Sequence, residues 1–183
     1  MNSLSKSGCV FAAVLLHASA ANAEAPDAIA ARGETHVATV HAQGAQVYEC
    51  KADAAGKLAW QFREPIATLF EHGKTVGRHY AGPNWEFADG SAIVGKVVAR
   101  APGATDNDIP LLKLEVTSRR GTGRLAEVTT IQRINTKDGV TEGSCPKAGA
   151  FLSVPYAADY AFYRKSRQSA APDSTRTAER GPR

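Results

Sequence analysis

The segment Trp85-Glu-Phe-Ala-Asp-Gly-Ser-Ala-Ile-Val94 predicts a β-hairpin near the middle of the chain. Trp85 and Phe87 are two residues apart, a spacing that places both side chains on one face of a strand. Glu86, between them, is expected to point away from the core. Asp89-Gly90 is the strongest short-range signal for a hairpin turn, and we expect a tight turn with positive φ at both residues.

Short runs rich in β-branched and aromatic residues continue on both sides of this hairpin, separated by Gly, Pro, Asn and Asp. In one run Leu112, Leu114 and Val116 alternate with polar residues, as in a half-buried antiparallel strand. We therefore predict about ten short strands, from the candidates His36–Ala42, Ala45–Cys50, Leu58–Arg63, Ala67–Glu71, Thr75–Tyr80, Asn84–Phe87, Ser91–Arg100, Leu111–Ser118, Arg124–Asn135, Ala150–Val154 and Tyr160–Arg164. Ile66–His72 is alternatively one turn of helix. In a chain of 183 residues this pattern indicates one all-β domain, an antiparallel β-barrel or a β-sandwich, with little helix.

The N-terminus reads as a secretory signal peptide over residues 1–23. Lys6 precedes the apolar run Cys9-Val-Phe-Ala-Ala-Val-Leu-Leu16, and Ala21-Asn-Ala23 matches the A-x-A pattern of a cleavage site. The apolar run is too short to span a membrane, and no later run is long enough. We expect an exported protein, periplasmic or extracellular, with a flexible lead-in at residues 24–34 and an all-β domain at residues 35–165.

The positive net charge of +4 belongs to the ends of the chain. Of the 22 Lys and Arg residues, Lys6 lies in the predicted signal peptide and six lie after position 163, so the region 24–163 is close to neutral. No basic face remains that would favour nucleic-acid binding. Residues 166–183 contain Pro, Ser, Thr and Arg and no large apolar side chain, which predicts a disordered basic tail. This tail is expected to make at most weak contact with an anionic envelope polymer.

Removal of the signal peptide also removes Cys9, which leaves Cys50 and Cys145. An even number of cysteines in an oxidising compartment favours a disulfide, and we predict a Cys50–Cys145 bond. Two unpaired buried thiols are the alternative.

The longer segment Gly77-Arg-His-Tyr-Ala-Gly-Pro-Asn-Trp-Glu-Phe-Ala-Asp-Gly-Ser91 closely resembles a family of secreted bacterial and fungal proteins known as domain of unknown function 3455. Further matching segments are Gln46-Val-Tyr-Glu-Cys50, Ile131-Gln-Arg-Ile-Asn-Thr136 and Val154-Pro-Tyr-Ala-Ala-Asp-Tyr-Ala-Phe-Tyr163. The resemblance extends over roughly residues 44–163. It implies export, and it carries no activity, ligand or catalytic residue over to this chain.

Turn and strand formation explains the glycines, Pro83, Trp85 and Phe87 of that segment, but not every polar residue in it. His79 near a carboxylate is a candidate general base or ligand-orienting donor, although a lone histidine on a half-buried strand is more often simply hydrogen-bonded. Tyrosines near the C-terminus suit either a core edge or a ligand platform. The candidate ligand-binding residues are His79, Trp85, Glu86, Asp89, Ser91, Tyr156 and Tyr160.

The remaining motifs predict neither a metal nor a cofactor. The histidines lack metal-ligand spacing, and Gly121-Thr-Gly-Arg-Leu-Ala126 precedes the strand-forming run Val128-Thr-Thr-Ile131, so it reads as a glycine turn and not as a dinucleotide loop. We predict a non-catalytic binding module for a small molecule or glycan of the cell envelope. The alternatives are a hydrolase-like enzyme that uses His79 with Glu86 or Asp89, and an envelope or surface interaction protein.

Overall fold

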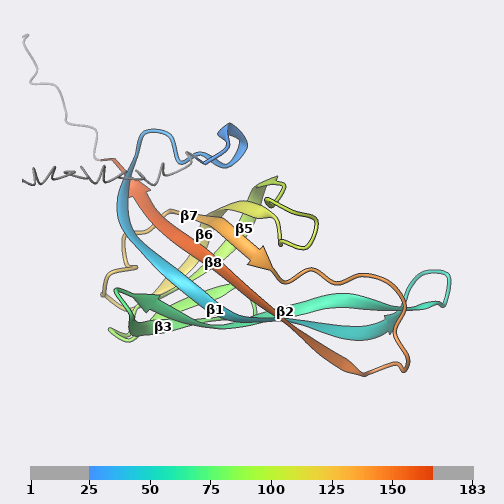
Figure 1. Ribbon diagram of the computed structural model, residues 1–183. Helices are drawn as coiled ribbons and strands as arrows, with labels where there is room; N and C mark the ends of the chain where they lie inside the picture. The colour runs from blue at the N-terminus through green and yellow to red at the C-terminus, as the bar shows by residue number, and fades with distance from the viewer. Residues whose placement is uncertain (1–24, 167–183) are drawn as a thin grey trace, which may run out of the picture.

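Residues 25–166 of the computed structural model form an antiparallel β-barrel (Figure 1). Each strand pairs with the next along the chain, and the last pairs with the first. The all-β prediction is confirmed, and of the two architectures expected the sheet is the closed one. The elements are η1 (Asp27–Ile29), β1 (Glu34–Ala52), β2 (Leu58–Glu71), β3 (Lys74–Tyr80), β4 (Asn84–Phe87), β5 (Ala92–Ala101), β6 (Leu111–Arg120), β7 (Thr130–Asp138) and β8 (Phe151–Lys165).

The expectation of about ten short strands is close, but three pairs of predicted segments are each one long strand. β1 continues through Gly44, β2 continues through Pro65, and β8 joins the last two candidates. β2 occupies the region where a helical turn was the alternative. One predicted boundary is wrong: β7 begins at Thr130 and not at Arg124, because residues 121–127 form bends and turns.

The long strands extend beyond the barrel as a three-stranded arm, made of residues 46–52 and 58–66 of β1 and β2 and residues 151–155 of β8 (Figure 1). Two prolines mark where it leaves. Pro65 lies two residues before Ala67, the first β2 residue that pairs with β3, and Pro155 directly precedes Tyr156, the first β8 residue that pairs with β7. Proline has no N–H to donate, so it suits a strand position that has lost one neighbour.

The arm carries the predicted disulfide, which joins Cys50 in β1 to Cys145 in the segment between β7 and β8. Cys50 is completely buried. The same segment also pairs with the arm through its backbone, since Cys50 N–H donates to Ala150 O at 2.8 Å and Trp60 N–H donates to Gly143 O at 3.1 Å. The disulfide therefore fastens a connecting segment to the arm.

The opposite end of the barrel is filled by side chains. Leu125 and Val128, in the segment between β6 and β7, are completely buried. Trp85, Leu114, Ile131 and Phe162 are among the buried residues of the interior, each from a different strand. The residues expected to be a flexible lead-in are partly docked, because Ile29 is completely buried and its carbonyl oxygen accepts a hydrogen bond from Gln132 Nε2 at 2.6 Å.

The central hairpin forms where the sequence placed it, but its turn differs from the one predicted. Gly90 has a φ of 83°, whereas Asp89 is not among the residues with positive φ. Gly90 N–H donates to Phe87 O, and Phe87 N–H donates to Ser91 O. This is a three-residue turn ending in a left-handed glycine, the next commonest hairpin connection after the two-residue one. The Asp89 side chain accepts hydrogen bonds from the turn, which a longer connection allows.

No helix among residues 25–166 is long and apolar enough to cross a membrane. The predicted signal peptide and all of the predicted tail beyond Ser166 lie outside the residues that the structure describes.

Candidate functional site

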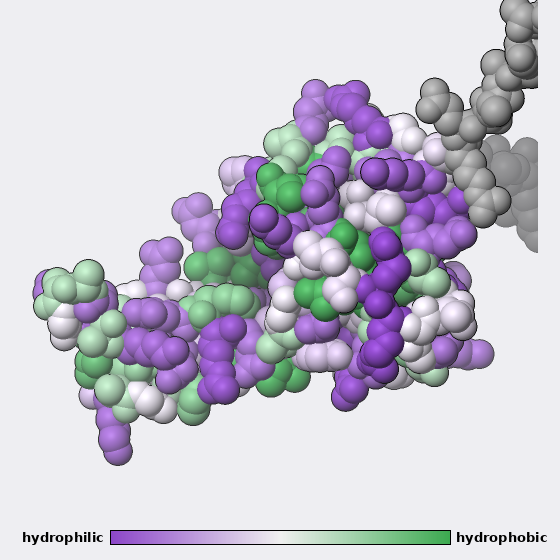
Figure 2. All heavy atoms as spheres, turned by 180° about the vertical axis from the view of Figure 1, so that it is seen from behind, coloured by the Kyte–Doolittle hydropathy of each residue, from purple (hydrophilic) through white to green (hydrophobic). Residues whose placement is uncertain are grey.

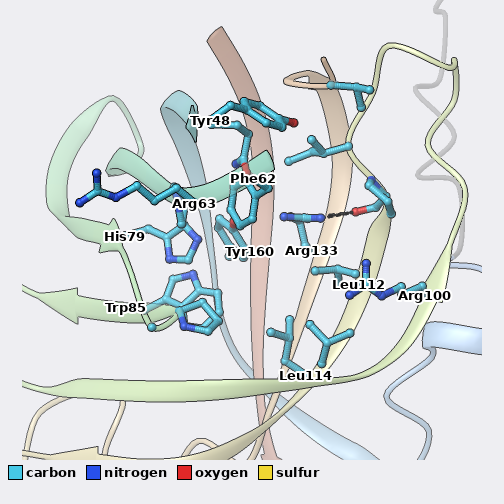
Figure 3. Close-up of a pocket in the computed structure, with 18 residues that line it drawn as sticks. Tyr48, Phe62, Arg63, His79, Trp85, Arg100, Leu112, Leu114, Arg133 and Tyr160 are labelled. Atoms are coloured by element: carbon cyan, nitrogen blue, oxygen red, sulfur yellow. Dashed lines mark hydrogen bonds between the residues drawn. The ribbon is translucent and has the colours of Figure 1, made fainter. Parts of the chain in front are cut away.

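A cavity of about 440 Å³ opens at the end of the barrel from which the arm leaves (Figure 3). Its floor is apolar and comes from β4, β5 and β6, with Trp85, Val97, Leu112 and Leu114. The base of the arm forms another wall, and Figure 2 shows hydrophobic residues gathered where the arm meets the barrel. The arm residues that line the cavity are Gln46, Tyr48, Phe62, Arg63 and Pro65.

Three of the predicted site residues come together in this cavity. The His79 ring stacks on Trp85 with a centroid separation of 4.4 Å and an interplanar angle of 16°. Tyr160 meets both rings, at 4.9 Å from His79 and 5.2 Å from Trp85. The three residues come from β3, β4 and β8, so the closure of the barrel brings them together. They form an aromatic wall of the cavity, and Trp85 and Tyr160 are also part of the hydrophobic core.

His79 is held as a neutral imidazole. Its side chain is only 3% exposed, and Nδ1–H donates to the carbonyl oxygen of Asn84 at 2.8 Å. Burial lowers the pKa of His79 to about 3, and the charge of Arg133 adds to this effect, while the Asn84 hydrogen bond opposes it. None of the hydrogen bonds described for residues 25–166 joins His79 to a carboxylate. The geometry of a base with an acidic partner is therefore not formed here.

The depressed pKa of His79 predicts a pH-dependent stability. In the unfolded chain this histidine titrates near 6.5, whereas in the folded protein it stays neutral down to about 3. Below pH 6.5 the unfolded state binds the extra proton, so stability falls as pH falls and levels off below about pH 3. Between pH 7 and pH 5 we expect a loss of about 2 kcal/mol from this group, measured by urea unfolding.

The variant His79→Phe keeps a ring on Trp85 and removes the titrating group, so its unfolding free energy is expected to change less between pH 7 and pH 5. His72→Asn is the matched control, because His72 is exposed and asparagine tolerates its left-handed backbone. This control is expected to keep the pH dependence of the wild type. If the unfolding free energy of His79→Phe fell between pH 7 and pH 5 by as much as that of the wild type, this would contradict the attribution of the pH dependence to His79.

Glu86 lies outside the barrel, as the sequence predicted, and away from the cavity. It accepts hydrogen bonds from Tyr80 OH at 2.8 Å and from Arg78, and it forms an ion pair with Arg120. The Tyr80 and Arg78 hydrogen bonds hold the pKa of Glu86 below its usual range. These contacts tie β3, β4 and β6 together on their outer face.

Asp89 and Ser91 lie at the closed end of the barrel. Asp89 Oδ1 accepts hydrogen bonds from Ser91 N–H and Oγ–H, and Oδ2 accepts one from Arg124 N–H at 2.8 Å. Ser91 Oγ in turn accepts a hydrogen bond from Leu125 N–H. Burial tends to raise the pKa of Asp89, but these hydrogen bonds together bring it below its usual value. Asp89 and Ser91 thus link the hairpin turn to the segment between β6 and β7 that closes this end of the barrel.

Tyr156 is buried in β8 and does not line the cavity. Burial raises the pKa of its hydroxyl above the usual range. Of the seven predicted residues, the structure thus brings together His79, Trp85 and Tyr160 at the cavity and places the other four elsewhere.

The cavity also contains polar residues that the sequence reasoning missed. Arg133 points inward from β7, and its Nε and Nη2 donate to the carbonyl oxygen of Pro110 at 3.0 and 2.8 Å (Figure 3). Gln46 and Tyr48 come from β1, and Tyr48 OH donates to Gly139 O at 2.7 Å. The alternation of side chains along a strand could have identified Arg133 as inward-facing. Arg133 is two residues from Ile131, a core residue, so both side chains point to the same face.

No group of three or more His, Cys, Asp or Glu residues within residues 25–166 is placed to hold a metal ion. Comparison with curated proteins and with solved structures gives no match to this chain. A family model does match, over residues 30–164, and its description is a protein of unknown function (DUF3455). This match covers the barrel and the arm together, and the chain belongs to the DUF3455 family.

Proposed function

We propose that this protein is a non-catalytic module that binds a small, largely apolar molecule in the cavity at the mouth of the barrel. The cavity carries this proposal. Its volume of about 440 Å³ falls within the range of small-molecule sites, and its walls are apolar and aromatic with few polar groups.

Two buried nitrogen atoms in the cavity residues support a ligand. Gln46 Nε2 and Trp85 Nε1 are buried N–H donors that have no hydrogen-bond partner among residues 25–166. A buried donor without a partner is costly, and in native proteins it usually has an explanation. A ligand that offers a hydrogen-bond acceptor to either nitrogen would supply the partner that these donors lack.

The hydrolase-like alternative has no comparable observation in its favour. His79 uses Nδ1 on a backbone carbonyl, and Glu86 and Asp89 are engaged by other partners on the outer face and at the closed end. His79, Glu86 and Asp89, the residues named for this alternative, are therefore not assembled at one place.

We also propose that the protein works outside the cytoplasm. The predicted signal peptide supports this proposal, and a disulfide on the arm is typical of an oxidising compartment. Reversible binding of a ligand outside the cytoplasm requires no energy source. It is therefore compatible with a passive ligand carrier or sensor.

A fluorescent probe tests the binding proposal. The neutral dye N-phenyl-1-naphthylamine is expected to bind the purified exported protein with enhanced emission. Val97→Trp places a large ring in the cavity and is expected to weaken dye affinity about 10-fold or more, because the space is then filled. Val98→Trp is the matched control, since Val98 is the next residue of β5 and is 46% exposed.

Equal dye binding by Val97→Trp and Val98→Trp would contradict the proposed site. An absence of binding to the wild type, in a screen that also includes oligosaccharides, would contradict a binding function in this cavity.

A further inference from the structure

Arg133 carries a positive charge in the wall of the cavity without a carboxylate partner. It is half-buried, and among residues 25–166 the ion pairs include no acidic residue bound to Arg133. Other arginines of the barrel do have such partners: Arg78 and Arg120 pair with Glu86, and Arg124 pairs with Glu71. Arg133 instead donates two hydrogen bonds to the backbone carbonyl of Pro110 and lies near the Tyr160 hydroxyl, and neither group bears a net charge.

The residues that line the cavity offer Arg133 no acidic counter-charge. None of the cavity-lining residues is Asp or Glu in the part of the chain that the structure describes, whereas three are arginines: Arg63, Arg100 and Arg133. Arg63 forms an ion pair with Glu64 and lies over the Phe151 ring, so it is already engaged. Arg100 is exposed at the rim and forms no ion pair with the acidic residues described. The cavity therefore has a net positive lining.

The field of Arg133 reaches across the cavity. Its charge lowers the pKa of Tyr48 and Tyr160, although burial outweighs this effect and raises the pKa of both hydroxyls. Figure 3 shows Arg133 near the middle of the lining residues, with the aromatic wall of His79, Trp85 and Tyr160 on one side of it. Two of its five N–H donors are used on Pro110, which leaves donors for another acceptor.

Taking a cation out of water costs free energy unless a counter-charge accompanies it. We infer that the ligand of this cavity carries an oxyanion, a carboxylate or phosphate, that binds Arg133 while its apolar part lies on Trp85, Leu112 and Leu114. An arginine fork matches the two oxygen atoms of such a group. This inference rests on the proposed binding function and names the class of ligand.

The test compares ligands of equal chain length that differ in their head group. Decanoate, decyl phosphate, decanol and decylamine are titrated against the wild-type protein, by displacement of N-phenyl-1-naphthylamine. Decanoate or decyl phosphate is expected to bind about 10-fold or more tightly than decanol, as for a hydrogen bond to a charged group, and decylamine is expected to bind least well. The tighter of the two anions identifies the head group.

Arg133→Met is expected to reduce the affinity for the anion to that for decanol and to leave the affinity for decanol within about twofold, because only the charge-assisted hydrogen bonds are lost. Arg133→Lys retains the positive charge but not the forked guanidinium. Its affinity for the anion is expected to lie between those of the wild type and Arg133→Met. Arg119→Met is the matched control. Arg119 also donates to a backbone carbonyl, that of Val128 at 2.8 Å, but it does not line the cavity.

Equal affinity of the wild type for decanol and for both anions would overturn the inference and leave the proposed binding function intact, since decanol would still bind. An equal loss of anion affinity in Arg119→Met would overturn it as well. The comparison of ligands on the wild type does not depend on whether the Arg133 variants fold. Failure of every ligand and of the dye would instead count against the binding function itself.

Discussion

Gly44→Val is expected to lower the free energy of unfolding by about 3 kcal/mol or more, the upper end of the cost of overpacking. A Cβ atom at position 44 would overlap the carbonyl oxygen of Ile66 and lie 2.6 Å from the Cα of Ala67. Both are backbone atoms of the adjacent strand, so neither can rotate away. β1 and β2 would have to separate at the point where the arm leaves the barrel.

The measurement is urea unfolding followed by tryptophan fluorescence, and Ala45→Val is the matched control. Ala45 is the next residue of the same strand and is half-buried, and valine favours strands. We expect a midpoint close to that of the wild type for Ala45→Val and a much lower one for Gly44→Val. Similar midpoints for the two variants would show that the strands are not this close at Gly44.

The same residue explains what the sequence could predict of the fold and what it could not. Alternation of apolar and polar residues predicted the strands, and it did so correctly because one face of each is buried. It did not predict that β1 is continuous. A glycine can end a strand, or it can lie within a strand and allow another backbone to approach closely, and the sequence alone does not distinguish these two cases. The prolines of the arm posed the same problem. Pro65 reads as a break, yet it marks the loss of one neighbouring strand.

The candidate site was predicted only in part, for a related reason. The most distinctive segment drew attention to Glu86, Asp89 and Ser91, and the structure gives each of them hydrogen bonds that hold strands and turns together. A dense motif can thus reflect the requirements of folding. Arg133 was missed because one inward-facing arginine in a strand resembles a surface residue until the closure of the barrel shows what lies opposite.

Removal of the Cys50–Cys145 disulfide is the second change with a large expected effect. The bond joins cysteines 95 residues apart in sequence, and a closed loop of this size is worth up to about 4–5 kcal/mol in the chain-entropy model. For the double variant Cys50→Ala/Cys145→Ala we expect a loss of about 2–4 kcal/mol, since observed effects are often smaller than the model value. Urea unfolding with and without dithiothreitol measures it, and the reductant is expected to affect the wild type only.

The disulfide also bears on the cavity, because the segment that it fastens reaches the mouth of the barrel. Val140 lines the cavity, and the neighbouring Gly139 carbonyl accepts the hydrogen bond from Tyr48. Beyond the disulfide, backbone hydrogen bonds such as those at Cys50 and Trp60 hold this segment on the arm. We therefore expect the double variant to bind N-phenyl-1-naphthylamine more weakly than the wild type even at urea concentrations where it remains folded.

Thiol labelling of the native exported protein completes this test. In a chain that has lost the predicted signal peptide, Cys50 and Cys145 are the remaining cysteines, and the disulfide leaves neither free to react. An alkylating reagent is expected to add no mass before reduction and two groups after it. Labelling before reduction, or an unfolding midpoint of the double variant equal to that of the wild type, would contradict the structural role of the bond. Labelling at Cys9 would show that the N-terminal segment is retained, and the case for export would then lose its main support.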